Sequence, residues 1–205
     1  LAATAASSRA LSGSVTDSDD TPTILWTALG TGTDAGASCT FANAAAAVTS
    51  VTCTDDGAWT LTLTADDGTN PPVADSLLLT IANANPGVGA GADQAAAVGE
   101  TVSLDPATFS DAGANDTHTA QIDWGDGTAV VAGNVGTGTV SGSHAYGAPG
   151  TYTVTVTVTD DDTGAGSDTL TVTVSALPND PPVVAAGTDG AGTEGSSVAL
   201  SGSVT

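Results

Sequence analysis

The residues IDWGDGTAVV at 122–131 and GTYTVTVTVTDDD at 150–162 decide the fold of this chain. In the second stretch, apolar residues from Tyr152 to Val158 alternate with threonines, and this period of two predicts a β-strand with one buried and one exposed face. Asp126–Gly127 predicts a two-residue hairpin turn, because Asp and Gly tolerate the two successive positive φ angles that such a turn needs. A further alternating strand, SDTLTVTV at 167–174, follows.

Three motifs succeed one another in this half of the chain: WGDG at 124–127, HAY at 144–146 and PGTYTVTVTVTDDD at 149–162. In this order they resemble the PKD domain, an immunoglobulin-like β-sandwich found in tandem on microbial surface proteins. The resemblance is looser over the first half, where GAWTLTLTADDGT at 57–69 takes the place of the long strand. It implies an all-β fold of tandem immunoglobulin-like β-sandwiches in an elongated array.

Two internal repeats set the expected domain organisation. ALSGSVT at Ala10–Thr16 recurs at Ala199–Thr205, an offset of 199 − 10 = 189 residues. Residues between Asn83 and Leu104 recur in part between Asn179 and Leu200, an offset of 179 − 83 = 96. We therefore expect a sandwich over residues 1–82, a second over 83–176, and the linker and first strands of a third over 177–205.

The first sandwich lacks a counterpart of Pro181–Gly187, the segment expected to open the third. A preceding unit would supply it, either within a longer continuous chain or by donation of a strand from another molecule, since an unpaired sheet edge accepts an added strand. We favour the continuous chain, because residues 190–205 duplicate residues 1–16. The chain has no initial Met and no signal peptide, so we expect an excerpt of a longer protein.

The chain is strongly acidic. One basic residue, Arg9, stands against 23 acidic ones, which gives a formal net charge of −22. Attraction to a phosphate backbone or to an anionic membrane surface needs clustered Lys and Arg, so neither is an expected partner. The sequence also lacks an apolar run of about 20 residues that could insert into a membrane. Cations are the natural partners of such a chain.

Nearly all the acidic residues are Asp, concentrated where strands are expected to end. Calcium prefers carboxylate and carbonyl oxygens, although Asp is also common in ordinary turns. Several PKD domains bind calcium through a linker Asn, an Asp loop and an Asp pair. The resemblance transfers these roles in the second sandwich to Asn83, Asp111, Asp160 and Asp161.

The first sandwich has its own candidate calcium ligands by the same resemblance. The matching loop and pair are Asp17, Asp19, Asp20, Asp66 and Asp67. The linker residues that complete this site would be counterparts of Asn179 and Asp180, upstream of the chain. An ion at each joint would fix the angle between modules.

Two features concern covalent modification. Cys39 and Cys53 lie in what we expect to be two short neighbouring strands, so they are predicted to form a disulfide, and two cysteines are too few for a four-ligand zinc site. A disulfide favours an oxidising compartment, and we expect an extracellular, cell-surface location. Asn115-Asp116-Thr117 is an N-glycosylation sequon.

Residues that support catalysis are scarce. Trp124, His144 and Tyr146 occupy positions expected to close the sandwich, and His118 is isolated. Glycoside hydrolysis can use two carboxylates, but it also needs an aromatic-lined cleft, and the chain has only three Trp, two Tyr and two Phe. We expect no enzyme activity.

The leading functional prediction is a structural repeat unit of a long extracellular surface protein or fibre, stiffened by calcium and associated with copies of itself. The alternative is an adhesin segment or an accessory module that contacts polysaccharide or protein. A carbohydrate-binding module should expose aromatic rings, whereas Trp26, Trp59 and Trp124 all lie at core-type positions of the expected strands. Exposure of any of these rings would favour the alternative.

Overall fold

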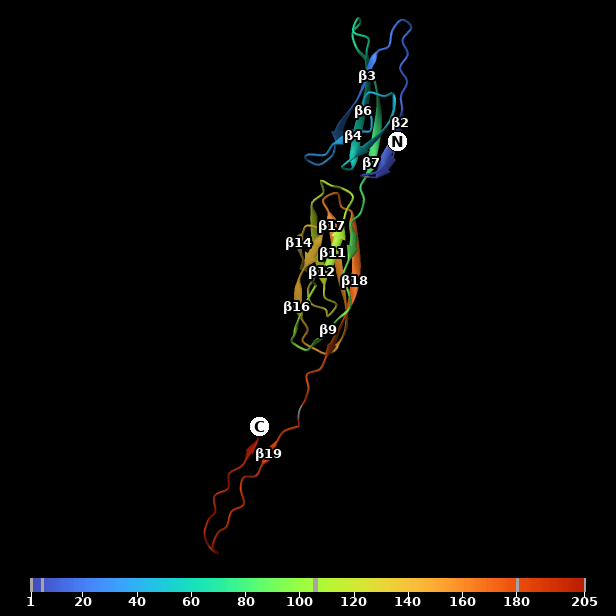
Figure 1. Ribbon diagram of the computed structural model, residues 1–205. Helices are drawn as coiled ribbons and strands as arrows, with labels where there is room; N and C mark the ends of the chain where they lie inside the picture. Colours follow the sequence, from blue (N-terminus) through green and yellow to red (C-terminus); the bar gives the residue numbers. More distant parts are fainter. Residues whose placement is uncertain (1, 5, 105–106, 180, 205) are drawn as a thin grey trace. The chain divides into compact units, whose positions relative to one another are not determined.

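The computed structural model describes residues 2–4, 6–104, 107–179 and 181–204. The described residues form strands, turns and loops without a helix, so the predicted all-β class is confirmed. In this part of the chain there is accordingly no helix long and apolar enough to cross a membrane. The chain divides into two compact units, residues 1–175 and 176–205 (Figure 1).

The C-terminal half of the larger unit is a sandwich of antiparallel sheets. One layer is the five-stranded sheet β13-β12-β17-β18-β9, in which only β9 lies parallel to its neighbour. The other layer holds the sheets β14-β15-β11-β8 and β10-β16. The strands are β8 (Gly87–Gly89), β9 (Gln94–Ala97), β10 (Thr101–Ser103), β11 (Ala107–Ser110), β12 (His118–Asp123), β13 (Val131–Ala132), β14 (Asn134–Gly136), β15 (Thr139–Ser141), β16 (Ser143–Ala145), β17 (Gly150–Asp160) and β18 (Ala165–Ser175).

The core of this second sandwich lies against β17. Val154, Val156 and Val158 are fully buried, while the threonines between them remain partly accessible. These valines pack with Ile122 and Trp124 in one cluster of buried residues that draws on both layers. Burial of each such side chain contributes about 1.5–3 kcal/mol. The strand predicted from the alternation is therefore confirmed, including which face is buried.

The connection between β12 and β13 differs from the expected two-residue turn. The two strands pair antiparallel, but residues 124–130 connect them. Positive φ angles fall on Gly125 and Gly127 and not on Asp126, so the prediction of two successive positive φ angles at Asp126–Gly127 was wrong. Gly125 is required here, because a Cβ would collide with the Thr153 carbonyl oxygen.

Hydrogen bonds of the WGDG and HAY motifs explain the longer connection. The Asp126 carboxylate accepts bonds from the Thr128 N–H and hydroxyl, and its other oxygen lies 2.8 Å from His144 Nε2. The His144 ring stacks on Trp124, and the buried Tyr146 hydroxyl donates to the Trp124 carbonyl at 3.0 Å. The two motifs therefore bind each other and close this end of the sandwich.

The N-terminal half of the larger unit is a smaller sandwich. Its layers are the sheets β1-β7-β6-β3 and β2-β5-β4, antiparallel except for the β1–β7 pair. A separate buried cluster fills it, with Trp26, Trp59, Leu61 and Leu79 among its members. The strands are β1 (Ala2–Thr4), β2 (Ser8–Ser12), β3 (Thr23–Thr31), β4 (Cys39–Phe41), β5 (Val48–Cys53), β6 (Gly57–Asp66) and β7 (Val73–Ala82).

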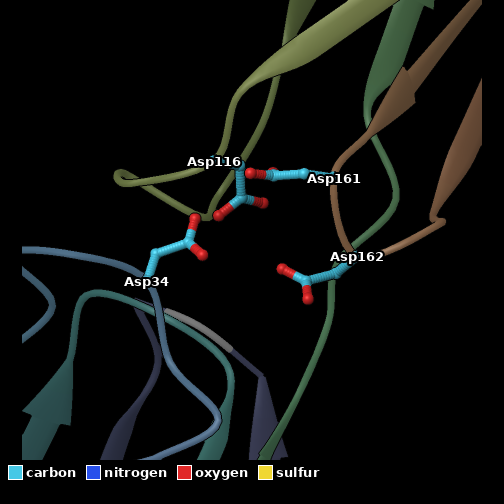
Figure 2. A group of neighbouring side chains, drawn as sticks. All are labelled: Asp34, Asp116, Asp161 and Asp162. Atoms are coloured by element: carbon cyan, nitrogen blue, oxygen red, sulfur yellow. The ribbon is translucent and has the colours of Figure 1, made fainter.

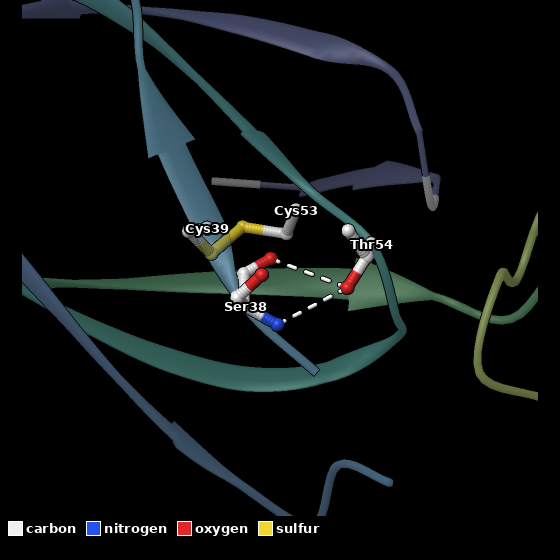
Figure 3. Close-up of a disulfide and its surroundings, with 4 residues drawn as sticks. All are labelled: Ser38, Cys39, Cys53 and Thr54. Atoms are coloured by element: carbon white, nitrogen blue, oxygen red, sulfur yellow. Dashed lines mark hydrogen bonds between the residues drawn. A yellow bond between two sulfur atoms is a disulfide. The ribbon is translucent and has the colours of Figure 1, made fainter. Parts of the chain in front are cut away.

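The predicted disulfide is present. Cys39 of β4 lies directly opposite Cys53 of β5, and their sulfur atoms are bonded (Figure 3). Beside the bond, the Ser38 N–H donates to the Thr54 hydroxyl, and that hydroxyl donates back to the Ser38 carbonyl. The disulfide thus links β4 and β5 covalently, two strands that pair over three residues.

The smaller unit, residues 176–205, contains one short antiparallel pair. Strands β19 (Val184–Ala185) and β20 (Ser203–Val204) pair with Val184 opposite Val204. Both valines are exposed, because no second layer among the described residues of this unit packs against these strands.

Replacement of both cysteines by serine should destabilise the first sandwich. The bond closes a loop with a sequence separation of 14 residues, for which chain-entropy arguments give about 3 kcal/mol. We expect Cys39→Ser/Cys53→Ser to unfold at lower urea concentration than the native chain. Reducing agent should lower the stability of the native chain in the same way and leave the double variant unchanged, and an equal response of both proteins would contradict the assignment.

Tyr146→Phe should destabilise the second sandwich by about 1–2 kcal/mol, because a buried carbonyl of Trp124 loses its donor. Burial also raises the pKa of Tyr146 to about 12. The matched control is Tyr152→Phe, which removes a hydroxyl bonded to the exposed Ala148 carbonyl. Urea unfolding should show a clearly larger loss for Tyr146→Phe, and equal losses would show that the buried bond has no special weight.

Candidate metal centre

Carboxylates from the loops of both sandwiches meet in one region of the larger unit. Figure 2 shows Asp34 from the β3–β4 loop facing Asp116 from the β11–β12 loop and the pair Asp161–Asp162 from the β17–β18 turn. Ligand oxygens of these four residues lie within 4.8 Å of one another. Each of the three loops leaves the end of a strand that is anchored in a core, so the strands set where the carboxylates lie.

Two further groups of carboxylates adjoin this one. Asp55 and Asp56, from the β5–β6 loop, form a group with Asp162. Asp111 and Asp160, at the end of the second sandwich, form a group with Asp116. Because Asp116 and Asp162 each belong to two groups, the three groups form one continuous acidic region, which we call the junction cluster.

Hydrogen bonds join the loops that carry the junction cluster. The Ala114 N–H of the second sandwich donates to the Thr54 carbonyl of the first at 3.1 Å. The side-chain amide of Asn115 donates to the Ala35 carbonyl at 3.2 Å. Asn115 is also the glycosylation candidate, so a glycan on its Nδ2 would replace a hydrogen at this contact; glycosylation there stays a prediction.

Asp55 is the most deeply buried member of the cluster. Its side chain is fully enclosed; Oδ2 accepts a hydrogen bond from the Asp34 N–H at 2.6 Å, and Oδ1 has no partner among the described residues. Both carboxylate oxygens of Asp116 are likewise enclosed without a hydrogen-bond partner in the described part of the chain. Buried carboxylate oxygens without donors are costly, and a bound cation would remove that cost.

The pKa values of several carboxylates in the cluster are raised by burial and by repulsion from their neighbours. Burial raises the pKa of Asp116 to about 7, with further contributions from the charge of Asp111, from sharing a proton with the neighbouring Asp55 carboxylate, and from the charge of Asp55. Burial also raises the pKa of Asp34, with a further contribution from Asp161, and raises the pKa of Asp162, with a further contribution from Asp56. The cluster therefore holds protons that ordinary aspartates would have lost, or it needs positive charge.

Other members of the cluster are held by donors. Asp160 accepts bonds from the Gly164 N–H at 2.6 Å and from the Asn83 side-chain amide at 2.9 Å. Burial works against ionisation of Asp161, but two hydrogen bonds from Thr117, each 2.9 Å long, outweigh it and hold the pKa of Asp161 below its usual value. These bonds orient the carboxylates toward the cluster.

The residues predicted for the second sandwich lie together. Asp111, Asp160 and Asp161 all belong to the junction cluster, and Asn83 is bonded to Asp160. Five further members of the cluster were not predicted from the sequence as ligands: Asp34, Asp55, Asp56, Asp116 and Asp162. The adjacent pair in TDDG at 54–57, between a cysteine and a glycine of positive φ, was the available signal for part of this set.

The residues predicted for the first sandwich lie at the opposite end of β6 from Asp55. Asp66 ends that strand and Asp67 follows it, and Asp17, Asp19 and Asp20 occupy the β2–β3 loop. Within the described residues, none of the five joins a group of three close ligands. The side chain and backbone of Asn70 and the Thr69 N–H lower the pKa of Asp67 to about 2.

The two predicted linker ligands lie in the smaller unit. Asn179 is exposed, and Asp180 falls outside the described residues. A metal role for them, as for the first-sandwich set, stays a prediction.

The donor set of the junction cluster consists of carboxylate oxygens, with backbone carbonyls nearby. Calcium takes six to eight oxygen ligands in flexible geometry, whereas zinc prefers nitrogen and sulfur. The unpartnered Oδ1 of the buried Asp55 and both oxygens of Asp116 are the kind of acceptors that a hard cation satisfies. The residues present therefore fit calcium.

The architecture is that of immunoglobulin-like β-sandwich proteins. More particularly, residues 83–175 match the family of the PKD domain, which supports that domain type for the second sandwich. No curated protein sequence is significantly similar to the chain.

Similar solved structures are β-sandwich proteins of low sequence identity. The fibronectin(III)-like modules of Clostridium thermocellum CbhA are 15% identical, with 85% of this chain and 89% of that chain covered and a TM-score of 0.36. Drosophila N-cadherin EC1-3 is 14% identical, with 86% of this chain and 64% of that chain covered and a TM-score of 0.37. The insect immune protein hemolin is 13% identical, with 86% of this chain and 44% of that chain covered and a TM-score of 0.40. The chain thus spans less than two thirds of the N-cadherin and hemolin chains.

The raised pKa of Asp116 should make the metal-free protein less stable as the pH rises. Between about pH 4 and pH 7 the unfolded chain has lost this proton while the folded chain keeps it, so the free energy of unfolding falls with pH. Asp116→Asn should flatten that fall in urea unfolding with chelator present. Asp67→Asn is the control, because the lowered pKa of Asp67 affects stability only below about pH 4. A slope that survives Asp116→Asn would refute the assignment.

Proposed function

We propose that this chain is a structural segment of an extracellular surface protein or fibre in which calcium binds at the junction between successive β-sandwiches. A PKD-type immunoglobulin-like domain fits an extracellular structural or adhesion module. The observation that carries the proposal is the buried Asp55, whose unpartnered oxygen lies in a cluster of carboxylates contributed by both sandwiches.

The charges explain why a junction of this kind needs an ion. Asp34 and Asp55 come from the first sandwich and Asp116, Asp161 and Asp162 from the second, so without a cation the loops of the two sandwiches repel each other. A divalent ion bound by both would turn this repulsion into attraction and limit bending between the sandwiches. The net charge of −22 extends the same argument to contacts between molecules.

The proposed location is extracellular. The Cys39–Cys53 disulfide requires an oxidising compartment to persist, and a disulfide is most useful in a small sandwich with a thin core. Self-association is part of the proposal, because a long exact repeat suits an array of equivalent contacts.

An adhesin or accessory module that binds polysaccharide is the second candidate, and the aromatic residues weigh against it. Trp26, Trp59 and Trp124 are all buried, and the large hydrophobic side chains that are exposed are aliphatic. Sugar rings stack on exposed aromatic faces, which these tryptophans do not offer. His118 contacts the Asp111 carboxylate and His144 contacts the Asp126 carboxylate; we propose that both contacts hold loops in place and have a non-catalytic role.

Calcium titration by calorimetry tests the function. We expect saturable binding, and we expect chelator to lower the melting temperature by several degrees, because a ligand that binds only the folded state stabilises it. Asp116→Asn should weaken calcium affinity about tenfold or more, since it removes a charge shared by two of the three groups.

The matched control is Asp189→Asn, which removes the same charge from the smaller unit. It should leave calcium affinity unchanged. Absence of saturable binding, or an equal loss of calcium affinity in both variants, would contradict a calcium site at the junction. The cluster would then be a set of turns whose carboxylates are partly protonated.

A further inference from the structure

The strands β3, β6 and β7 of the first sandwich present an outward surface that carries exposed leucines, and we call it the leucine face. We propose that the leucine face packs against the same face of a second copy of the chain, so that two molecules associate side by side. This inference rests on the self-association included in the proposed function and names the surface that carries it.

Three leucines lie on the outward side of the sheet, away from the core. Leu25 and Leu29 of β3 are 52% and 70% exposed, and Leu78 of β7 is 59% exposed. Thr60 of β6 lies opposite Leu29 on one side and opposite Leu78 on the other, so these three residues form a row across the strands. Single exposed leucines are common, but several on one sheet face form an apolar patch, and such patches mark contact sites.

The leucine face is nearly uncharged in a chain with 23 acidic residues. Along β3, β6 and β7, which the structure describes completely, the outward residues are Leu, Thr, Ser and Ala, and only Asp66 at the end of β6 is acidic. Two chains with a net charge of −22 repel each other, and the repulsion is weakest where two uncharged faces meet. A basic partner would gain no ion pairs on this face, so the surface fits a second copy.

Hydroxyl groups of the leucine face already have hydrogen-bond partners within the sheet. Thr62 Oγ1 and Ser76 Oγ lie 2.9 Å apart across β6 and β7, and the Thr23 hydroxyl donates to the Asp66 carbonyl at 3.1 Å. A hydroxyl group with a partner loses less free energy on leaving water than an unpaired one. A second sheet can therefore cover this face without leaving these groups unpaired.

The row of Leu29, Thr60 and Leu78 suits a two-fold axis along β6. Such an axis places Thr60 opposite Thr60 of the second copy, and Leu29 opposite Leu78 of the second copy. The leucine contact then forms twice, because a two-fold contact uses the same patch on both molecules. Two sheets packed in this way lie about 10 Å apart with their strands nearly aligned.

The size of the leucine face predicts a weak dimer. Its strands have 9 or 10 residues and are about 30 Å long, and three strands side by side are about 15 Å wide. A patch of this size lies at the lower end of stable protein interfaces. Further copies of the sandwich in a longer chain would add equivalent patches, and linked weak contacts strengthen one another.

The second sandwich shows that the sheet does not need the leucines. At the place of Leu78 it has Thr171, and at the place of Leu25 it has Gln121, since each pair lies opposite equivalent threonines of β6 and β17. The strands pair in the same way in both sandwiches. The leucines therefore point to a role other than strand pairing.

Sedimentation of the full chain tests the proposal, with chelator present throughout. We expect reversible dimerisation that strengthens with sodium chloride, because salt screens the repulsion and leaves the apolar contact. Leu25→Gln/Leu78→Thr should raise the dimer dissociation constant about tenfold or more. These residues occur at the equivalent places of the second sandwich, so the fold should be retained. The matched control is Val48→Thr/Val130→Thr, which removes two valines, 71% and 52% exposed, outside the leucine face and should leave the constant unchanged.

Cross-linking locates the contact. A short bis-maleimide reagent should link Thr60→Cys chains about tenfold faster than Val48→Cys chains, because only the first cysteine lies opposite its own copy. A native chain that stays monomeric up to about 1 mM, or a dimer that the leucine variant does not weaken, would overturn the leucine face as the contact. Equal linking of both cysteine variants would overturn the two-fold axis. Calcium binding is measured separately by calorimetry, so its failure and the failure of this contact are distinguishable.

Discussion

Each sandwich depends on one central strand whose every second side chain is buried. In β17 these are valines, and in β6 they are Trp59, Leu61 and Leu63, with neighbours paired on both sides along the strand. Because the side chains between them are mostly Thr, which is branched and fits the pleated surface, the strand keeps its form without a larger core. Because the cores are thin, functional side chains can cluster at the ends of these strands and not in cavities between them.

The strand ends are acidic, and acidity there has a structural cost. Asp160 ends β17 in a buried position and is satisfied by Gly164 and Asn83, so its charge is tolerated. Asp116 lies close to it, and within the described residues neither oxygen of Asp116 has a donor; Oδ1 of Asp55, in the same cluster, also lacks one. A chain with no Lys and one Arg cannot satisfy them with its own cations. The negative charge of the junction cluster therefore has to be balanced by a cation from solution.

The sequence predicts the elements of this fold better than the contacts between sandwiches. Period-two alternation is a local signal, so β17 and β18 could be predicted residue by residue, and with two cysteines only one disulfide was possible. The turn at Asp126 was mistaken because its geometry depends on His144 and on the close approach of Gly125 to Thr153, both distant in sequence.

The candidate site divides in the same way. Asp111, Asp160 and Asp161 could be named because the PKD resemblance carries them within one domain. Asp34 and Asp55 could not, since they come from the neighbouring sandwich and join the cluster only through the packing of loops against each other. Sequence periodicity does not indicate which loops of two neighbouring sandwiches lie in contact.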